Sequence, residues 1–270
     1  MTPASPTDKW SSGDPYERYM GRWSRQLAPR FLHWVDAPRG LRWLDVGCGT
    51  GALSGAINDL CAPTALIGVD PSAGFLEVAA KRLPAHTVLH RASALQLPLR
   101  DAEVDVAIAA LVLNFVPDTA VALSEMVRVT ANGGTVAACV WDYAGCMEMI
   151  RTYWNAATDL GLVAAGPNQG ERFPICEPEA LAAAFSAAGL QQVETAGIEI
   201  EMRFADFDDY WQPFLGGQGP APAHAMSLDE PQRGQLRDLL QRRLETTTGS
   251  PLVLKARAWA ARGQVAGKPV

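Results

Sequence analysis

The sequence predicts an α/β protein: a Rossmann-like, seven-stranded, mostly parallel doubly wound sheet with an antiparallel last strand and helical cap or lid insertions. Three observations lead to this prediction. Short apolar runs alternate with helical patterns between residues 41 and 141, as in βαβ units. One run, "VDVAIAALVL", is almost wholly apolar, as buried parallel strands are. A glycine-rich turn joins the first strand to the helix that follows it.

Length and composition set the limits of the fold and of its partners. The 270 residues are 48% hydrophobic, which suffices for one large domain or for a domain with an elaboration. The net charge of −6 and the lack of a Lys/Arg run argue against a nucleic-acid partner. No uninterrupted apolar segment approaches bilayer length, so we expect no membrane partner.

Cysteine usage and the N-terminus predict a cytoplasmic protein without a metal. The five cysteines are odd in number and form no CxxC pair, which favours a reducing compartment. The start "MTPASPTDKWSSGDP" lacks the apolar core of a signal peptide. No His, Cys, Asp or Glu group has the spacing of metal ligands, so we expect no metal.

The first elements are a polar start and an aromatic helix. Residues 1–14 are rich in Pro, Ser and Gly, and we expect them to be disordered. Apolar and aromatic residues then recur at helical spacing from Tyr16 to Trp34, with Pro29 as a possible break. We take residues 1–35 as an N-terminal segment and cap helix.

Strands and helices alternate over residues 36–144, the predicted cofactor-binding core. Ser72 and the Asn132-Gly133-Gly134 turn supply a helix N-cap and a helix end. The predicted strands are 41–46, 65–70, 86–92, 104–113 and 135–141, and the predicted helices are 52–60, 72–83 and 119–130.

The regular alternation of predicted strands and helices ends after Asp142. Residues 145–262 are predicted to hold the rest of the sheet, with cap insertions at about 145–175 and 206–248; residues 263–270 form a tail. Alternating patterns make residues 189–203 the sixth strand and residues 252–260 a seventh strand at an edge of the sheet. Residues 216–225, rich in Gly and Pro, are the best candidate for a mobile lid.

The glycine turn is flanked by two carboxylates. The spacing Gly47, Gly49 and Gly51 does not by itself exclude a dinucleotide. Asp45, two residues before the first glycine, would suit an ammonium group better than a pyrophosphate. Asp70, at the end of the second strand, can accept hydrogen bonds from both hydroxyls of a ribose. A ligand with an adenosine and an ammonium group but no phosphates, such as S-adenosylmethionine, fits both.

Four quoted stretches extend this pattern. "LDVGCGTG", "GVDPSAGFLEVA", "RASALQLPLRDAEVDVAIAALVLNFVPD" and "PDTAVALSEMVRVTANGGTVAACVWD" resemble successive motifs of class I S-adenosylmethionine-dependent methyltransferases. The resemblance covers residues 41–142 and is closest to the small-molecule group that includes ubiquinone and menaquinone biosynthesis methyltransferases, the methyltransferase type 11 domain. "YERYMGRWS" is also typical of that group. Ser93 departs from the motif, because the family has an Asp there beside the adenine amino group.

The resemblance implies S-adenosyl-L-methionine as cofactor and a set of binding residues. Its departure at Ser93 shifts adenine recognition toward an uncharged hydroxyl or backbone groups. The expected cofactor-binding residues are Tyr19, Trp23, Asp45, Gly47, Cys48, Gly49, Thr50, Gly51, Asp70, Pro71, Ser72, Ser93, Ala94, Leu95, Ala110 and Leu111.

The implied activity is methyl transfer to O, N or C of a small, aromatic or hydrophobic metabolite. No catalytic base stands out; the weak candidates are His224 in the lid and Asp142 and Tyr143 after the fifth strand. Asp142 could equally cap a helix. The expected acceptor-pocket aromatics, some of which could instead fill the core, are Trp141, Tyr143, Tyr153, Trp154, Phe173, Phe207, Tyr210, Trp211 and Phe214.

Two other functions remain open at this point. A nicotinamide-dependent oxidoreductase would share the fold class, but the sequence lacks a Tyr-x-x-x-Lys or comparable catalytic set. A non-catalytic S-adenosylmethionine-binding protein would bind the cofactor without turnover. The expected assembly is a monomer or a homodimer.

Overall fold

The computed structural model describes residues 17–163, 172–217, 219–244 and 251–267. The predicted disordered start at residues 1–14 lies outside them. The chain divides into two compact units. The core unit comprises Ser24–Trp141, Phe173–Ile198 and Ala258–Val270, and the helical unit comprises Met1–Trp23, Asp142–Arg172 and Glu199–Arg257.

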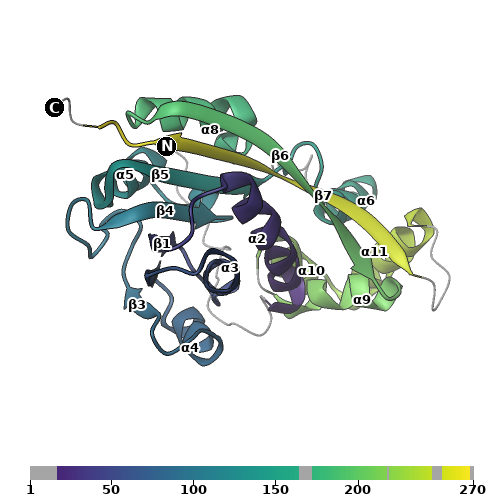
Figure 1. The fold of residues 1–270 in the computed structure, drawn as a ribbon. Coiled ribbons are helices and arrows are strands. Elements are labelled where there is room, and N and C mark those ends of the chain that lie inside the picture. Colours follow the sequence, from purple (N-terminus) through teal and green to yellow (C-terminus); the bar gives the residue numbers. More distant parts are fainter. Residues whose placement is uncertain (1–16, 164–171, 218, 245–250, 268–270) are drawn as a thin grey trace. The chain divides into compact units, whose positions relative to one another are not determined.

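A seven-stranded sheet with the order β3-β2-β1-β4-β5-β7-β6 confirms the predicted fold class (Figure 1). Strands β1 to β5 pair in parallel, and β7 is antiparallel to β5. The strands are β1 (Arg42–Val46), β2 (Ala65–Asp70), β3 (Val88–Arg91), β4 (Val104–Ala110), β5 (Thr130–Trp141), β6 (Gln191–Phe204) and β7 (Leu252–Gln264).

The prediction that the last strand lies at an edge is wrong. Strand β7 lies between β5 and β6, so β3 and β6 are the edges of the sheet. Ala258, Ala260 and Ala261 of β7 are fully buried, as the small side chains of an interior strand can be. Strand β7 also runs four residues beyond the predicted end at residue 260, where Gly263 pairs with Val136.

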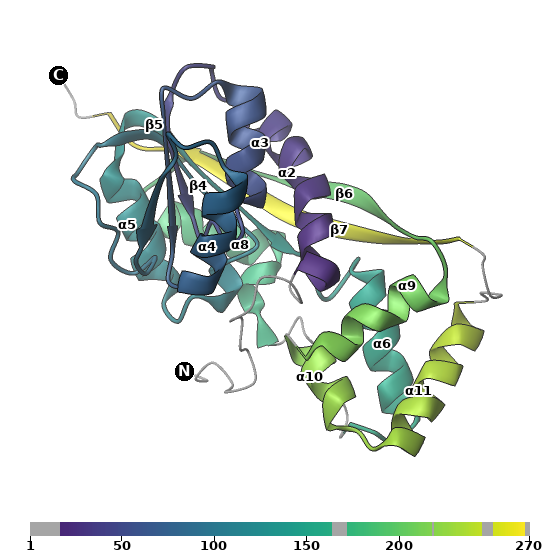
Figure 2. The same ribbon diagram turned by 90° about the horizontal axis from the view of Figure 1, so that it is seen from below.

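Helices cover both faces of the sheet in the core unit. From β1 the chain adds β2 and β3 toward one edge of the sheet, whereas it adds β4 and β5 toward the other edge. Because the crossover connections are right-handed, the helices of these two groups lie on opposite faces of the sheet. Helices α3 and α4 accordingly lie on one face, and α5 and α8 on the other (Figures 1 and 2). These helices are α3 (Ala52–Cys61), α4 (Ala73–Arg82), α5 (Thr119–Val129) and α8 (Pro178–Ala187).

Two predicted boundaries in the core unit change. The Asn132–Gly134 turn, expected to end the preceding helix, lies inside β5, which already begins at Thr130. The pairing of β4 with β5 shifts register between Val104 and Val106, and this irregularity accommodates the extra residues. Ser72 is the N-cap of α4 as predicted, since its hydroxyl accepts the Phe75 N–H at 3.3 Å.

The predicted N-terminal helix consists of η1 (Glu17–Gly21), a π-helical turn, and α2 (Arg22–Val35). Pro29 does not break it, because the helix continues for six residues beyond it. Pro29 is exposed, on the side of the helix that faces away from the core. Leu27 and Phe31, on the buried side, hold the helix in place.

The helical unit contains α6 (Glu148–Asp159), α9 (Phe207–Trp211), η4 (Gln212–Gly216), α10 (Pro220–Ser227) and α11 (Glu230–Arg243). Helix α10 occupies most of the segment read as an irregular lid. Pro220 suits the first turn of a helix, where its missing N–H would be unpaired in any case. Ala221 and Ala225 of α10 are buried, so this segment is a packed helix.

Most of the predicted pocket aromatics are packed in protein cores. Phe214 lies at the centre of a cluster in the helical unit: it stacks on Tyr153 at a centroid distance of 4.7 Å and contacts Tyr210 and Trp211. Phe173, in the core unit, packs edge-on against Phe115 at 5.4 Å. The buried members of the set are Trp141, Tyr153, Phe173, Phe207, Tyr210, Trp211 and Phe214. This burial shows that the seven side chains pack within the protein, and their predicted role in an acceptor pocket stays a prediction.

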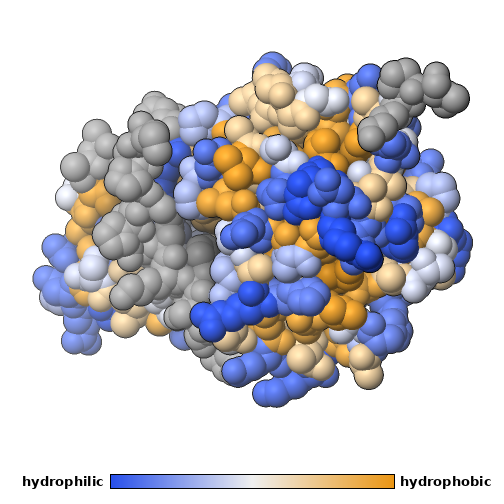
Figure 3. Space-filling model, turned by 90° about the vertical axis from the view of Figure 1, so that its left-hand side faces the viewer, coloured by the Kyte–Doolittle hydropathy of each residue, from blue (hydrophilic) through white to orange (hydrophobic). Residues whose placement is uncertain are grey.

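The surface of the described residues carries isolated hydrophobic side chains. On the face drawn in Figure 3, hydrophobic and hydrophilic residues are interleaved. The exposed large hydrophobic residues come from five different elements and need no binding partner to explain them. They are Leu60, Val88, Val121, Met226 and Val253.

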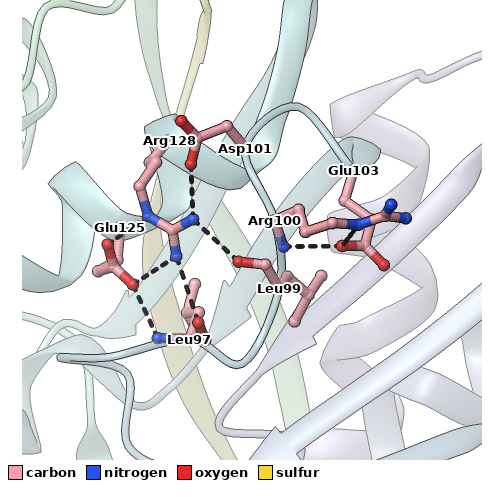
Figure 4. Close-up of polar contacts among 7 residues, drawn as sticks. All are labelled: Leu97, Leu99, Arg100, Asp101, Glu103, Glu125 and Arg128. Atoms are coloured by element: carbon pink, nitrogen blue, oxygen red, sulfur yellow. Dashed lines mark hydrogen bonds and ion pairs between the residues drawn. The ribbon is translucent and has the colours of Figure 1, made fainter.

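The loop between β3 and β4 is clamped to α5 (Figure 4). The Arg128 guanidinium donates to the carbonyls of Leu97 (3.2 Å) and Leu99 (2.9 Å) and to the Asp101 carboxylate at 2.8 Å. It also forms a two-pronged ion pair with Glu125 at 2.6 and 2.8 Å. Glu125 in turn accepts the Leu97 N–H at 2.8 Å. The loop therefore depends on two α5 side chains for its path.

We expect Arg128→Met to lower the free energy of unfolding by about 2 kcal/mol, because it removes several charge-assisted hydrogen bonds and leaves two carbonyls unpaired. Urea denaturation followed by circular dichroism measures this loss. Arg100→Met is the control: the Arg100 side chain is 89% exposed and contacts only Glu103 among the partners drawn in Figure 4. This variant should stay within about 0.5 kcal/mol of the parent protein. Equal losses in both variants would contradict the clamp.

Candidate functional site

The glycine loop leaves the carboxyl end of β1 in a tight turn. Gly47, Gly49 and Gly51 all have positive φ, at 72°, 54° and 88°. Such backbone favours glycine, because a side chain there is strained. The N–H groups of Gly47 and Cys48 both donate to the Val69 carbonyl, at 2.7 and 3.0 Å. The loop is thereby tied to the end of β2.

The glycines have different surroundings. A Cβ at Gly47 would lie 2.6 Å from the Val112 side chain, so this glycine allows the loop to pack against the segment after β4. A Cβ at Gly49 would meet only the Gly47 carbonyl, at 4.0 Å. Gly49 therefore presents bare backbone to open space, as a loop that lies against a ligand must.

Asp70 connects the glycine loop to the start of α4. Its Oδ2 accepts the Gly49 N–H at 3.0 Å and its Oδ1 accepts the Ser72 N–H at 2.8 Å. Burial raises the pKa of the Asp70 carboxyl, and these two hydrogen bonds oppose the rise. Each oxygen accepts one backbone hydrogen bond here, and a carboxylate oxygen has a second lone pair for a ligand hydroxyl.

Asp45 is a buried carboxyl beneath the same loop. It is 1% exposed, and its Oδ2 accepts the Ser54 hydroxyl at 2.6 Å. Burial raises the pKa of Asp45 to about 7, a rise that the Ser54 hydrogen bond opposes and the Asp70 charge increases. An ammonium group brought close would favour the ionised form.

Ser54 is a site residue that the sequence analysis missed. It is fully buried in α3, on the face that also carries Leu53, Ile57 and Cys61. A serine at the 3–4 residue spacing of this apolar stripe is a polar group that needs a buried partner. That pattern was readable from the sequence, and it points to the carboxyl end of β1.

The side chains of Cys48 and Thr50 are buried in the loop. The Cys48 sulfur lies against β2, 3.0 Å from where a Cβ at Gly68 would be. Burial raises the pKa of the Cys48 thiol, which makes it a poor nucleophile at neutral pH. The geometry supports the interpretation of Cys48 as a small core residue.

The predicted adenine-binding segment follows β3, which pairs with β2 so that Asp70 is opposite Arg91. The Arg91 Nε donates to the Pro71 carbonyl at 3.2 Å and joins the ends of the two strands. The Ser93 hydroxyl accepts the Leu95 N–H at 3.2 Å. That bond uses one of the backbone groups predicted to recognise adenine.

Ala110 and Leu111 lie at the carboxyl end of β4, next to the glycine loop. Leu111 has φ 62°, which is unusual for a residue other than glycine, and its N–H donates to the Cys139 carbonyl at 2.7 Å. Both residues are half-buried. Backbone in this conformation is often found at functional sites.

Tyr19 and Trp23 belong to the helical unit and pack among its aromatic residues. Tyr19 contacts Phe214 edge-on at 5.5 Å, and Trp23 contacts Phe204 at 5.1 Å. The Arg22 guanidinium lies 4.3 Å from the Trp23 ring centroid. Their predicted cofactor contact stays a prediction.

The candidate bases Asp142 and His224 are engaged in hydrogen bonds. The Asp142 carboxylate accepts the N–H groups of Gly145 (2.6 Å) and Cys146 (2.9 Å) and two from Arg257 (2.9 and 2.7 Å). His224 Nε2 lies 3.2 Å from the Leu162 carbonyl, and Nδ1 lies 2.7 Å from the Tyr153 hydroxyl. Both ring nitrogens of His224 therefore have hydrogen-bond partners in this arrangement.

Tyr143, the third candidate, is half-buried just after β5. Within the described residues no group of three His, Cys, Asp or Glu side chains could hold a metal ion. No described helix has the length and apolar character needed to cross a membrane.

The comparison with known families concerns the segment of the chain that forms this site. Residues 44–138, from β1 to β5, match the family described as a methyltransferase domain. This part of the chain is similar to a methyltransferase domain. The matched segment contains the glycine loop, Asp70 and Ser93. S-Adenosylmethionine is the methyl donor that this similarity implies.

Two curated relatives and one solved structure illustrate the similarity of the methyltransferase domain. Malonyl-[acyl-carrier protein] O-methyltransferase of Serratia marcescens is 32% identical over 143 residues, which are 50% of this chain and 55% of that protein. Demethylmenaquinone methyltransferase of Staphylococcus aureus (strain JH9) is 37% identical over 110 residues, 40% of this chain and 46% of the relative. The chain thus spans about half the length of these relatives.

The solved structure is phosphoethanolamine N-methyltransferase 2 of Haemonchus contortus, in complex with S-adenosyl-L-methionine. It matches with a TM-score of 0.55 at 15% identity, covering 94% of this chain and 56% of that one. At this identity the match shows a shared fold.

The titration of Asp45 predicts a pH-dependent affinity for the cofactor. If Asp45 faces the ammonium group, binding needs its ionised form, so S-adenosylhomocysteine should bind roughly tenfold more weakly at pH 6 than well above pH 7. Calorimetry from pH 5.5 to 7.5 measures the profile below the range where the ligand's own α-amino group titrates, about 7.7–8.0. The Asp45→Asn variant should have an affinity that changes little with pH. An unchanged pH dependence in that variant would show that another group causes it.

Unliganded protein should show the opposite trend in stability. The pKa of Asp45 is raised in the folded state, so between about pH 4 and 7 the folded protein keeps a proton that the unfolded chain has lost. Its contribution to the free energy of unfolding therefore falls as the pH rises through this window. Denaturant titrations at several pH values should show that the free energy of unfolding falls less with rising pH in Asp45→Asn than in the parent protein.

Gly49→Val should abolish cofactor binding and leave the fold intact. The added side chain would project into the open space beside the loop, and strain at φ 54° should cost about 1–3 kcal/mol of stability. Gly133→Val is a matched control, because Gly133 has φ 74°, lies in open space and belongs to the opposite end of β5. The control should lose similar stability and keep its affinity in calorimetry. Normal binding by Gly49→Val would make the loop purely structural.

Proposed function

We propose that this chain transfers a methyl group from S-adenosylmethionine to a small-molecule acceptor. The observation that carries the proposal is the Asp70 carboxylate, which accepts the Gly49 N–H and so lies directly beside the bare backbone of the glycine loop. Within a methyltransferase domain, this arrangement offers a hydroxyl-binding carboxylate next to a surface without side chains.

The residues of the site fit the parts of the cofactor. The free lone pairs of Asp70 would accept the two ribose hydroxyls. Asp45 would compensate the positive charge of the ammonium group. The ammonium group would in turn stabilise the charge of this buried carboxylate, which water solvates poorly. Gly49 leaves room for close approach, and the segment Ser93–Leu95 would lie beside the adenine. We propose residues 36–144 as the cofactor-binding domain on this basis.

The same electrostatics disfavour a dinucleotide. Asp45 and Asp70 are both buried beneath or beside the loop, and the charge of Asp70 already raises the pKa of Asp45. A pyrophosphate would add two further negative charges next to this pair, and like charges at close range oppose one another's ionisation. A cationic sulfonium compound relieves the same repulsion.

The protein's contribution to the reaction would be placement of the acceptor and exclusion of water. The sulfonium of the cofactor supplies an activated methyl group for in-line displacement. Because Asp142 and His224 are already hydrogen-bonded, we assign no general base. Holding the nucleophile in line with the methyl group is a proximity effect, which can supply a large part of the rate.

A small acceptor is consistent with the charge and with the relatives. The net charge of −6 disfavours nucleic acid as acceptor. The relatives are named for transfer to malonyl-[acyl-carrier protein] and to demethylmenaquinone, and the first name specifies oxygen. We propose a planar or hydrophobic small molecule, methylated at O, N or C, by a monomer or homodimer.

The direct test combines binding with transfer. Calorimetry should detect binding of S-adenosylmethionine and binding of S-adenosylhomocysteine with comparable affinity. It should detect no binding of NAD. Isotopically labelled S-adenosylmethionine should then transfer its methyl group to members of a small-molecule panel, with none to RNA, DNA or protein. Binding of NAD alone would replace the proposal by an oxidoreductase, and binding without any transfer would leave a cofactor-binding protein.

Asp70→Ala should weaken the binding of S-adenosylhomocysteine about a hundredfold, because two hydrogen bonds to a charged acceptor are lost. The control is Asp105→Ala, which breaks the ion pair with Arg42 in the first residues of β4 and β1. This control should bind with parent affinity. Unchanged binding by Asp70→Ala would remove Asp70 from the site.

A further inference from the structure

Asn114 carries a buried amide whose two polar atoms have no partner. Its Oδ1 and Nδ2 are both inaccessible to solvent and make no hydrogen bond with any described residue. Asn114 lies in η2 (Leu113–Phe115), the short helix that follows β4. A buried amide left unpaired on both atoms is rare in folded proteins, because each atom loses its hydrogen bonds to water.

The backbone around Asn114 is held in a fixed path. The N–H of Leu111 donates to the Cys139 carbonyl at 2.7 Å, and the N–H of Val116 donates to Leu113 at 3.3 Å. Val112 occupies the space next to Gly47, where a Cβ would lie only 2.6 Å away. The amide is therefore carried by a segment that packs on the glycine loop.

The topology of the sheet assigns this segment to the reacting end of the site. Strand order reverses between β1 and β4, and ligands of doubly wound sheets bind outside the carboxyl ends at that point. Asp70, at the end of β2, is on the side of β1 away from β4. With the ribose at Asp70, the segment after β4 would face the opposite end of the ligand, where the methyl group and its acceptor meet.

We propose that the Asn114 amide binds the methyl acceptor, and that it selects acceptors with a hydrogen-bond donor and acceptor side by side. This inference rests on the proposed function. The amide offers an acceptor at Oδ1 and donors at Nδ2. A primary amide or a lactam, in which an N–H and a carbonyl lie side by side, satisfies both atoms. A carboxylate satisfies only Nδ2 and repels Oδ1, and an ammonium group satisfies only Oδ1.

The first test separates this role from a structural one and from cofactor binding. Asn114→Leu replaces the amide by an apolar side chain of similar size, so the melting temperature of the unliganded protein should rise. Its dissociation constant for S-adenosylhomocysteine should stay within twofold of the parent. Thr87→Val is the control, because Thr87 Oγ1 is also buried without a partner but precedes β3, at the opposite end of the strands. It should match the stabilisation and change no binding.

The second test uses named probes on protein saturated with S-adenosylhomocysteine. Benzamide and 2-pyridone present a donor beside an acceptor, and benzoate is the planar carboxylate for comparison. Calorimetry should show at least one of the first two binding tenfold or more above benzoate. Asn114→Leu should abolish this preference, and Thr87→Val should retain it.

Several results would overturn the inference. A lower melting temperature in Asn114→Leu would make the amide structural, and weaker S-adenosylhomocysteine binding would make it part of the cofactor site. Equal or no binding of the probes by the parent protein would remove the proposed selectivity. Failure of the parent protein to bind S-adenosylhomocysteine at all would instead overturn the proposed function, so the two failures are distinguishable.

Discussion

The hydrogen bonds that Asp70 accepts hold the candidate site together. One carboxylate ties the Gly49 N–H, in the loop after β1, to the Ser72 N–H, at the start of α4. It thereby fixes two crossovers of the sheet relative to each other while remaining able to accept a ligand hydroxyl from each oxygen. The Val69 carbonyl, one residue earlier, adds two further hydrogen bonds to the same loop. Backbone hydrogen bonds hold the loop in place, so glycines can occupy the positions that a ligand must approach closely.

Beneath this loop, burial controls the charge of the site. Asp45 accepts a hydrogen bond from the Ser54 hydroxyl, and burial together with the charge of Asp70 raises its pKa to about 7. Such a pair is electrostatically unfavourable without a cation, and the cation that suits it must be small enough to reach a buried group. The site therefore favours a positively charged ligand over a pyrophosphate for a physical reason that is independent of sequence similarity.

Local patterns in the sequence predicted most of the elements between residues 36 and 144. The alternating runs placed β1, β2 and α3 within one or two residues, and the glycine spacing and Asp70 identified the loop and its partner. Long-range arrangement was less accessible. Nothing in residues 252–264 distinguishes a strand inserted between β5 and β6 from one at an edge, because both alternate.

One error arose from composition: Pro29 was read as a possible break, although α2 continues for six residues beyond it. The Gly- and Pro-rich segment at 216–225 was read as a mobile lid. It contains helix α10, since Pro220 is well suited to begin a helix and Ala221 and Ala225 bury one of its faces, and its mobility stays a prediction. Ser54 was missed although its place in the apolar stripe of α3 was readable from the sequence. Asn114 was missed because a sequence does not show that a buried amide lacks a hydrogen-bond partner.

A crystal structure of the protein with S-adenosylhomocysteine tests the central claim most directly. The account predicts that the ribose hydroxyls lie within hydrogen-bond distance of both oxygens of Asp70, and that the ligand passes over Gly49 with its ammonium group toward Asp45. A ligand bound with its ribose elsewhere, or with Asp70 contacting only Gly49 and Ser72, would contradict it.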